Sequence, residues 1–268
     1  MSSMSGWDDL TDGSMTNLTE RRVAWITGAG KGIGRALAKR LTLDGWTVAV
    51  SARTENDLAS LEAECANGTV HKFPLDVTDV DATTIVVKDI EAKLGNINLA
   101  ILNAGTHQEV TASHFSREPF QKLIDINLMG TVNGLSEIIP RFMERGFGHI
   151  AVVASVAGYR GLPTSAAYGA SKAALINMCE SLKPELDAND VKLQLINPGF
   201  VKTPLTDKNE FPMPFLMSLD VAVERIVAGL KSNTFEIRFP RRLAWILTAF
   251  KLIPDALYFA ITRRMTRP

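Results

Sequence analysis

The chain has 268 residues, of which 46% are hydrophobic and 22% charged, and its 29 basic side chains balance 29 acidic ones. This is an ordinary globular composition, and one domain of this length can bury a large core. The zero net charge argues against a nucleic-acid binder, which normally carries a basic excess. Two cysteines without metal-ligand spacing, Cys65 and Cys179, and four scattered histidines predict neither a disulfide framework nor a metal site.

The first twenty residues are rich in Ser, Thr, Asp and Gly and contain no apolar run. They lack the pattern of a secretory signal peptide, so we expect residues 1–20 to form a disordered leader. Nowhere does an uninterrupted apolar stretch reach the roughly 18 residues of a membrane-spanning helix. We therefore expect a cytoplasmic protein.

From Arg22 onward, short apolar runs alternate with longer amphipathic segments. The apolar runs predict buried strands at 23–27, 46–51, 70–75, 98–102, 149–154, 191–197 and 235–239. The amphipathic segments predict helices at 33–43, 55–66, 79–94, about 117–144 and 166–186. Strands that alternate with helices indicate a parallel sheet covered by helices on both faces and connected by right-handed crossovers. Because we find no repeat and no linker, we predict one α/β domain over residues 21–239.

A glycine-rich turn separates the first predicted strand from the first predicted helix. It reads Thr27-Gly28-Ala29-Gly30-Lys31-Gly32-Ile33-Gly34. Glycines at such a turn let the backbone approach a pyrophosphate, and the amides of the following helix N-terminus point at the anion. The spacing differs from the usual Gly-x-Gly-x-x-Gly, and a tight turn without a ligand is the alternative. Its position directly after the first strand favours dinucleotide binding.

The end of the second predicted strand indicates which dinucleotide binds. NAD-binding folds commonly carry an acidic residue there, which binds the ribose hydroxyls. This chain instead reads Val50-Ser51-Ala52-Arg53. Arg53 could pair with a 2′-phosphate, and Lys31 in the glycine turn could reach the same group. We therefore predict NADP(H) as the cofactor, with an exposed loop charge as the alternative for Arg53.

Tyr168 and Lys172 lie four residues apart in the predicted helix 166–186. Side chains at this spacing share one helix face. An ammonium beside a phenol favours the phenolate and lowers the pKa of the tyrosine from about 10. Such a tyrosine could exchange protons near neutral pH. The spacing is common by chance, so its meaning depends on the rest of the chain.

These features together resemble the short-chain dehydrogenase/reductase family in its short single-domain form. The motifs that match in order and spacing are Thr27 to Gly34, Asp76-Val77, Asn103-Ala104-Gly105, Asn127, Ser155, Tyr168 with Lys172, and Pro198-Gly199. The resemblance covers about Arg22 to Phe239. It implies a doubly wound, Rossmann-type parallel sheet of seven strands, with the cofactor across the carboxyl ends of the strands.

The resemblance also implies how the cofactor is held. Asp76 and Val77 would contact the adenine ring, and Asn103, Ala104 and Gly105 would line the cofactor after the fourth strand. A later segment would fold over the nicotinamide carboxamide, through Pro198, Gly199, Val201 and Thr203. The other expected cofactor-binding residues are Gly28, Gly30, Lys31, Gly32, Ile33, Gly34, Arg53, Tyr168 and Lys172.

The catalytic set that the resemblance implies is Asn127, Ser155, Tyr168 and Lys172. Hydride would pass between the nicotinamide and a carbonyl carbon while Tyr168 exchanges a proton with the carbonyl oxygen. Ser155 would stabilise that oxygen. Lys172 would lower the tyrosine pKa and hold the ribose, and Asn127 would hold a water that links Lys172 to solvent. A strand-end cap and a helix kink are the alternatives for Ser155 and Asn127. Tyr159 has no lysine four residues on, and we expect it in the pocket wall.

Two further segments bear on substrate and partners. Residues 204–218 are proline-rich and apolar and could close over a lipophilic ketone or alcohol; packing on the sheet edge is the alternative. The tail, 240–268, contains six basic residues, one acid and apolar residues at helical spacing. Such a basic amphipathic extension is typical of a membrane-surface element, although we favour packing on the domain or on a second subunit. The resemblance implies a homodimer or homotetramer formed through the helices at 117–144 and 166–186.

The leading hypothesis is an NADP(H)-dependent oxidoreductase that interconverts a carbonyl and a secondary alcohol, with a lipophilic small-molecule substrate and no nucleic-acid partner. One alternative is an epimerase or dehydratase. Enzymes of that kind resemble a longer form with a different glycine spacing, which this chain does not show. The other is a non-catalytic nucleotide-sensing or scaffold protein. Such a protein is expected to have lost the tyrosine or the lysine, both of which this chain retains.

Overall fold

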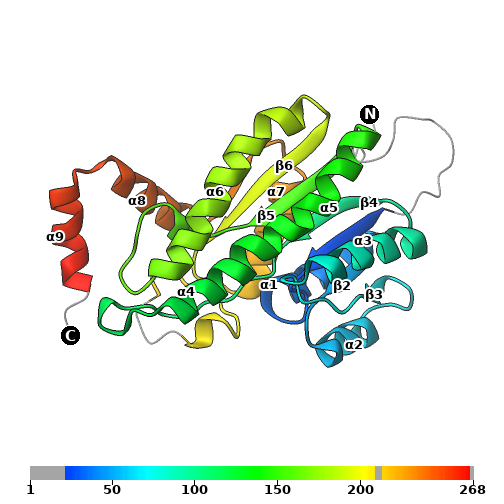
Figure 1. Cartoon of the computed structure of the whole chain (residues 1–268), viewed down its shortest axis with the longest axis horizontal. Coiled ribbons are helices and arrows are strands. Elements are labelled where there is room, and N and C mark those ends of the chain that lie inside the picture. Colours follow the sequence, from blue (N-terminus) through cyan, green and yellow to red (C-terminus); the bar gives the residue numbers. More distant parts are fainter. Residues whose placement is uncertain (1–21, 209–212, 266–268) are drawn as a thin grey trace.

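The computed structural model describes residues 22–208 and 213–265. Its centre is a seven-stranded sheet in the order β3-β2-β1-β4-β5-β6-β7, with every neighbouring pair parallel (Figure 1). The strands are β1 (Val23–Thr27), β2 (Thr47–Ser51), β3 (Val70–Lys72), β4 (Ile97–Leu102), β5 (Gly148–Val153), β6 (Val191–Pro198) and β7 (Glu236–Phe239). The predicted doubly wound α/β fold in a single domain is confirmed.

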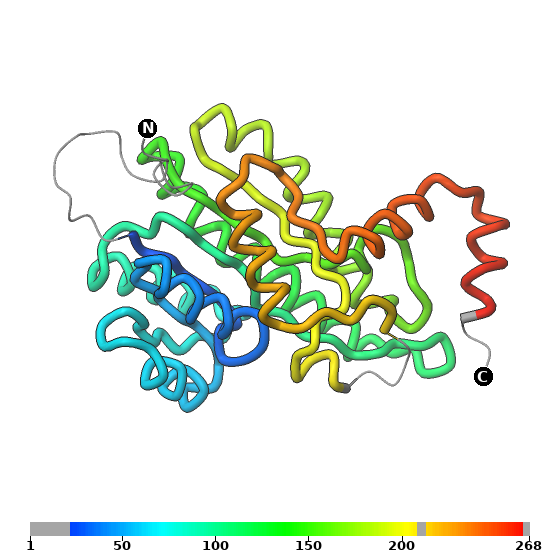
Figure 2. Tube along the Cα trace, turned by 180° about the vertical axis from the view of Figure 1, so that it is seen from behind, coloured from blue at the N-terminus to red at the C-terminus, as the bar shows by residue number. Residues whose placement is uncertain are grey.

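Helices cover both faces of the sheet. They are α1 (Gly32–Leu43), α2 (Glu55–Glu64), α3 (Val80–Leu94), α4 (Arg117–Ile124), α5 (Gly130–Arg145), α6 (Ala166–Asp187), α7 (Leu219–Leu230), α8 (Arg241–Leu252) and α9 (Asp255–Met265). One hydrophobic core packs α3, α5, α6 and α8 on the sheet, and a second packs α1, α2 and α7 on the opposite face (Figures 1 and 2). Because both faces are covered, every residue of β1 is buried, as expected for a continuous apolar run in a parallel sheet.

Two helical segments differ from the prediction. The single helix expected over 117–144 is interrupted by a π-helical turn, Asp125–Met129, between α4 and α5. Helix α7 was not among the expected elements, although Ala222, Val223, Ile226 and Val227 repeat with helical spacing and are buried. The π-helical turn matters for the site because Asn127 lies in it.

The tail does pack on the domain along one side. Leu243, Ala244 and Leu247 of α8 are buried in the core, whereas Trp245 and Ile246 are exposed. Helix α9 extends away from the body of the molecule (Figure 1). Across residues 22–208 and 213–265, no helix combines the length and apolar character needed to cross a bilayer. The expected leader, 1–20, and residues 209–212 of the expected substrate segment lie outside the described residues.

Candidate functional site

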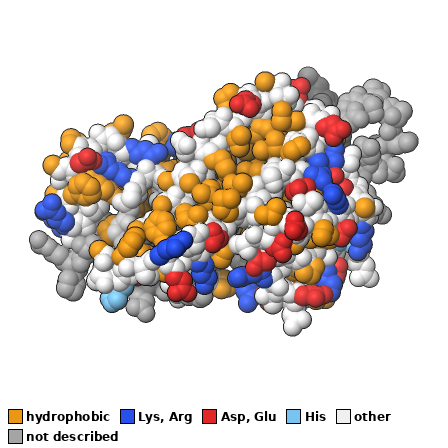
Figure 3. All heavy atoms as spheres, viewed as in Figure 1, with side chains coloured by type: hydrophobic (Ala, Val, Ile, Leu, Met, Phe, Trp, Pro, Cys, Tyr) orange, Lys and Arg blue, Asp and Glu red, His pale blue; other side chains and the backbone are white. Residues whose placement is uncertain are grey.

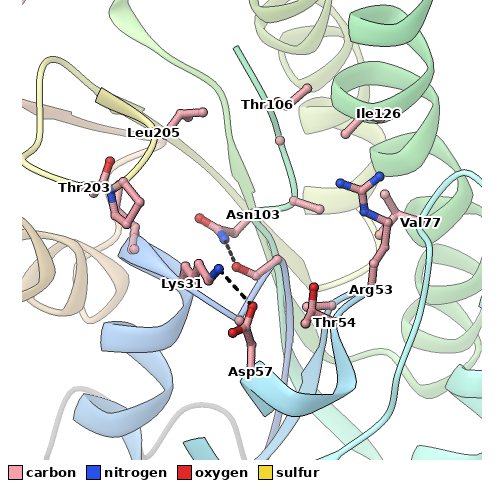
Figure 4. Close-up of a pocket in the computed structure, with 18 of the residues that line it drawn as sticks. Lys31, Arg53, Thr54, Asp57, Val77, Asn103, Thr106, Ile126, Thr203 and Leu205 are labelled. Carbon is pink, nitrogen blue, oxygen red and sulfur yellow. Dashed lines mark hydrogen bonds and ion pairs between the residues drawn. The ribbon is translucent and has the colours of Figure 1, made fainter. Parts of the chain in front are cut away.

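A cavity of about 400 Å³ opens at the carboxyl ends of the strands, where the strand order reverses between β1 and β4 (Figure 4). This crevice is the usual ligand site of a doubly wound sheet. Its wall comes from the glycine turn, the end of β2, residues 75–77, residues 103–106, Ile126 and residues 203–205. Sequence motifs that are distant in the chain therefore meet in one cleft.

The glycine turn is shaped for close approach of a ligand. Gly28 and Gly32 have φ angles of +66° and +57°, which side chains rarely adopt. A Cβ on Gly34 would lie 2.6 Å from the Gly28 carbonyl oxygen, so the first turn of α1 sits directly on the glycine turn. That first turn contains no acidic side chain, and its free amides would favour an anion. The turn therefore fits a pyrophosphate.

Asn103 holds the glycine turn in place. Its side-chain amide donates to the carbonyls of Thr27 (3.0 Å) and Gly28 (3.1 Å). The Thr27 hydroxyl accepts in return from the amides of Asn103 and Ala104, at 3.0 and 3.1 Å. Asn103, Ala104 and Gly105 all line the cleft, so this stretch both borders the cleft and fixes the glycine turn on its opposite wall.

At the far end of the cleft, Asp76 and Val77 line the cavity. The Asp76 carboxylate accepts from the amide of Thr78 at 3.0 Å and from its hydroxyl at 2.8 Å. These bonds fix the Asp76 carboxylate at the wall of the cavity.

The two basic residues expected at a 2′-phosphate point in different directions. Lys31 pairs with Asp57 of α2 at 3.4 Å, whereas the exposed Arg53 side chain points toward Val77 and Ile126 (Figure 4). Arg53 forms no hydrogen bond or ion pair with any residue that the structure describes. Asp57 was not predicted from the sequence because it lies beyond the end of β2, in the first turn of the following helix.

Ser155 and Tyr168 do converge. Ser155 follows β5 and caps a short 3₁₀ helix, Val156–Gly158, by accepting from the Ala157 amide at 3.1 Å. Its hydroxyl donates to the Pro198 carbonyl at 3.2 Å, and its proximity to the Tyr168 hydroxyl acts to lower the pKa of that phenol. Ser155 therefore caps the 3₁₀ helix and also lies beside Tyr168, so the capping role does not exclude the catalytic one.

Lys172 is 4% exposed, and its ammonium donates to the Val153 carbonyl at 2.8 Å. Burial lowers the pKa of Lys172 to about 8. The ammonium lies 5.8 Å from the centre of the Tyr168 ring. The pKa of Tyr168 is nevertheless raised, because its burial outweighs the opposing effect of the nearby Ser155 hydroxyl. The lowering of the tyrosine pKa by Lys172, expected from the spacing, is not seen in this structure.

Asn127 is fully buried in the π-helical turn. Its side chain accepts from the Thr106 amide (2.8 Å) and donates to the Thr106 carbonyl (3.0 Å) and the Ser171 hydroxyl (3.1 Å). It thus ties the segment after β4 to α6, beside Lys172. A Cβ on Gly105 would lie 3.4 Å from the Asn127 amide oxygen and 3.5 Å from the Lys172 ammonium, so Gly105 leaves room between them.

The segment after β6 divides into two parts. Thr203 lines the cleft. Val201 is buried and bridges to Met217. Gly199 packs against the tail, since a Cβ there would lie 2.8 Å from a methyl of Leu243. Of the expected contacts in this segment, Thr203 is the one that borders the cavity itself, and Pro198 reaches the site through Ser155.

Two aromatic side chains, His107 and Tyr159, make contacts that the sequence did not predict. The His107 ring stacks on Tyr168, with centroids 4.9 Å apart and planes 10° from parallel. Burial lowers the pKa of His107 and thus keeps the ring neutral at neutral pH. Tyr159, expected in the pocket wall, is instead 9% exposed in the core, and its hydroxyl donates to Glu236. The stacking of His107 on Tyr168 depends on how the loop after Gly105 folds, which the position of His107 in the sequence does not specify.

The fold, the cleft and the Ser155–Tyr168–Lys172 cluster define a dinucleotide-binding α/β protein. The family model for short chain dehydrogenase matches residues 22–212. The chain therefore belongs to the short-chain dehydrogenase family, whose members use nicotinamide cofactors.

Known relatives agree with this assignment. The chain is 40% identical over 246 residues to an uncharacterized oxidoreductase of Myxococcus xanthus, covering 91% of this chain and 97% of the relative. It is 34% identical over 191 residues to the 3-oxoacyl-[acyl-carrier-protein] reductase of Thermotoga maritima, covering 70% and 78%. A short-chain dehydrogenase from Streptomyces avermitilis shares the fold, with a TM-score of 0.79 at 23% identity over 91% of this chain and 96% of that chain. A Brucella melitensis 3-ketoacyl-(acyl-carrier-protein) reductase complexed with NADH gives a TM-score of 0.76 at 26% identity, covering 82% and 97%.

Proposed function

We propose that this protein is an NADP(H)-dependent oxidoreductase that interconverts a carbonyl group and a secondary alcohol. The observation that carries the proposal is the neighbouring Ser155 and Tyr168 hydroxyls, with the buried Lys172 ammonium beside them. This group lies next to a cleft whose glycine turn fits a dinucleotide. A scaffold protein would have no use for a buried ammonium beside paired hydroxyls.

Each residue of the cluster has a distinct role in this proposal. The bound nicotinamide supplies or accepts the hydride. Tyr168 donates its phenolic proton to the carbonyl oxygen during reduction, and Ser155 donates a hydrogen bond to the same oxygen. Lys172 provides positive charge beside the phenol and binds the ribose. Asn127 fixes the Thr106 segment and α6 next to Lys172, where it can support a proton path to solvent.

In this proposal the protonation state of Tyr168 at neutral pH suits the proton donation that reduction requires. The raised pKa of Tyr168 keeps its phenol protonated and ready to donate. Oxidation of an alcohol requires the phenolate, so its rate should rise with pH. Lys172, with a pKa of about 8, is still mostly charged at neutral pH.

The cofactor would be held along the cleft. The contributing residues are Gly28, Gly30, Lys31, Gly32, Ile33, Gly34, Arg53, Asp76, Val77, Asn103, Ala104, Gly105, Tyr168, Lys172, Pro198, Gly199, Val201 and Thr203. The preference for NADP(H) rests on Arg53 at the end of β2, where an acid would favour NAD(H).

The Arg53→Asp substitution should reverse this preference. We expect the affinity for NADPH to fall by about 10- to 100-fold, since charge-assisted hydrogen bonds contribute about 1.5–3 kcal/mol, and the affinity for NADH to be retained. Fluorescence titration with both cofactors measures the change. Arg117→Asp is the matched control, because Arg117 lines the adjoining cavity with Arg53 but lies outside the main cleft. Unchanged NADPH affinity in Arg53→Asp would refute the assignment.

We propose a lipophilic substrate. Phe115, Phe215 and Leu216 are exposed apolar side chains on segments that follow β4 and β6. The relatives named as 3-oxoacyl and 3-ketoacyl carrier-protein reductases act on acyl chains, which is consistent with this proposal. A panel of medium- and long-chain ketones, 3-oxoacyl thioesters and secondary alcohols, assayed with NADPH and NADP, tests the function directly. If no compound in the panel is turned over, the proposal fails.

We further propose a homodimer or homotetramer formed through α4, α5 and α6. Figure 3 shows hydrophobic side chains gathered over α5 and α6. Met129 and Met143, at the two ends of α5, are exposed, and Met178 and Leu182 of α6 are only partly buried. Light scattering of the purified protein measures the oligomeric state.

Peripheral membrane contact through residues 240–268 is a secondary proposal. Helix α8 exposes Trp245, Ile246 and Leu252, and its first turn carries the exposed Arg241 and Arg242, an arrangement typical of interfacial helices. In that case the protein should co-sediment with anionic liposomes, and Trp245→Glu should abolish the co-sedimentation without unfolding the chain. If wild type and Trp245→Glu are recovered equally in the supernatant, the proposal of membrane contact is wrong. Truncation at 239 is a poor test, because α8 also contributes buried core residues.

A further inference from the structure

The loop between Ser155 and Tyr168 is fastened to the C-terminal extension. Residues 156–165 connect β5 to α6 and pass beside α8 (Figures 1 and 2). Ser155 precedes this loop and Tyr168 follows it. A displacement of the loop that reaches either of its ends would therefore change the distance between the two hydroxyls.

Arg160 is the centre of the attachment. Its guanidinium donates to the carbonyls of Phe250 and Ile253, the latter at 3.1 Å, where α8 ends. It also pairs with Asp255 at 2.6 Å and lies 4.0 Å from the centre of the Tyr258 ring. The last carbonyls of a helix lack partners within the helix and carry partial negative charge. Arg160 therefore caps α8 and joins it to the first turn of α9.

The residues on both sides of Arg160 are attached as well. The Tyr258 hydroxyl donates to the Gly161 carbonyl. The Tyr159 hydroxyl donates to Glu236 of β7, and the Lys251 ammonium lies 4.9 Å from the centre of the Tyr159 ring. Three consecutive loop residues are thus bound to the part of the chain that follows residue 235.

The other end of the loop is held by the opposite wall of the site. The Val110 amide donates to the Thr164 carbonyl at 2.9 Å, and Val110 bridges to Ser165. The segment containing Val110 also contains His107, which stacks on Tyr168. The loop is therefore fixed between the extension on one side and the segment after β4 on the other.

We propose that the C-terminal extension, through Arg160, is the element that holds the Ser155–Tyr168 pair in register, and that Arg160 is a positioning residue for the reaction. The inference rests on the proposed function insofar as Ser155 and Tyr168 act on the substrate. The carbonyl and ring contacts carry most of the effect, because the Asp255 side chain is 82% exposed and such a surface ion pair contributes little.

The test compares Arg160→Met with Arg160→Lys and Tyr258→Phe in the full-length protein. Methionine keeps the length of the side chain but loses its charge and donors, lysine keeps the charge, and phenylalanine removes only the bond to Gly161. Arg242→Met is the matched control, since Arg242 is exposed at the start of α8 and bonds to no residue that the structure describes. Hydrogen exchange read by mass spectrometry follows the amides of residues 156–165, and titration with NADPH follows the cleft. Steady-state kinetics use the ketone that the wild type reduces fastest.

We expect Arg160→Met to exchange the 156–165 amides faster than wild type and to lower kcat about tenfold or more, while the NADPH dissociation constant stays within about twofold. Arg160→Lys should recover part of kcat, Tyr258→Phe should show a smaller loss, and Arg242→Met should match wild type. Unchanged exchange in 156–165, or faster exchange spread evenly over the whole chain, overturns the proposal. Failure of the proposed function is a separate result: no ketone is reduced by the wild type, while the exchange data still decide whether Arg160 fixes the loop.

Discussion

Replacing Tyr168 with phenylalanine should lower turnover by about 10²- to 10⁴-fold, the usual contribution of a positioned general acid. The substitution removes only the hydroxyl. The ring, its stacking on His107 at 4.9 Å and its place in the first turn of α6 are retained. The NADPH dissociation constant should therefore stay within about twofold of wild type. Single-turnover reduction of a ketone, with binding measured in parallel, separates the two effects.

The double variant Tyr168→Phe with Ser155→Ala sharpens this test. If both hydroxyls act on one carbonyl oxygen, removing both should cost little more than removing the tyrosine hydroxyl alone, because groups that act as a unit are not additive. If the loss of turnover in the double variant equals the product of the losses in the two single variants, the two hydroxyls have separate roles. Retention of more than about a tenth of wild-type turnover by Tyr168→Phe would contradict the general-acid assignment altogether.

The sequence predicted the sheet well because buried parallel strands are apolar along their whole length. Val23–Thr27 and Thr47–Ser51 show this plainly. Helix α7 was not predicted, although its apolar residues recur at regular helical spacing. The π-helical turn at Asn127 carries no local signal. It coincides with side-chain bonds from Asn127 to Thr106 and Ser171, whose partners lie 21 and 44 residues away.

The site was predicted where the residue type itself limits the chemistry, as for Tyr168, Lys172 and the glycine turn. It was not predicted where a contact depends on how segments meet. Asp57 reaches Lys31 only because α2 starts beside the glycine turn. The pKa of Tyr168 illustrates the same limit: spacing on a helix indicated a lowered value, but burial by neighbouring segments raises it. Helical spacing describes one neighbour, whereas desolvation depends on all of them.

Replacing Lys172 with methionine should abolish turnover and yet make the protein more stable at pH 7. Burial lowers the pKa of Lys172 from 10.5 to about 8. At 1.36 kcal/mol per pKa unit, keeping the ammonium in its site costs roughly 3 kcal/mol of folding free energy. Methionine removes that cost but leaves the Val153 carbonyl without its 2.8 Å donor, a loss of about 1 kcal/mol. The net gain in the free energy of unfolding should be roughly 2 kcal/mol.

The difference in stability between wild type and Lys172→Met should decrease as the pH rises. Between about pH 8 and pH 10.5 the unfolded chain still binds a proton at Lys172 that the folded chain has released. The stability of wild type therefore rises with pH over that window, while Lys172→Met has no such gain, and the advantage of the variant should shrink. Urea unfolding of both proteins at pH 7, 8, 9 and 10 measures the difference, with the exposed Lys88→Met as the control that shows no such trend. If Lys172→Met is less stable than wild type at pH 7, or if its gain in stability does not change with pH, then burial of the Lys172 ammonium does not destabilise the fold. A residue that destabilises the fold and is required for turnover is explained by its chemistry, because packing alone would favour its replacement.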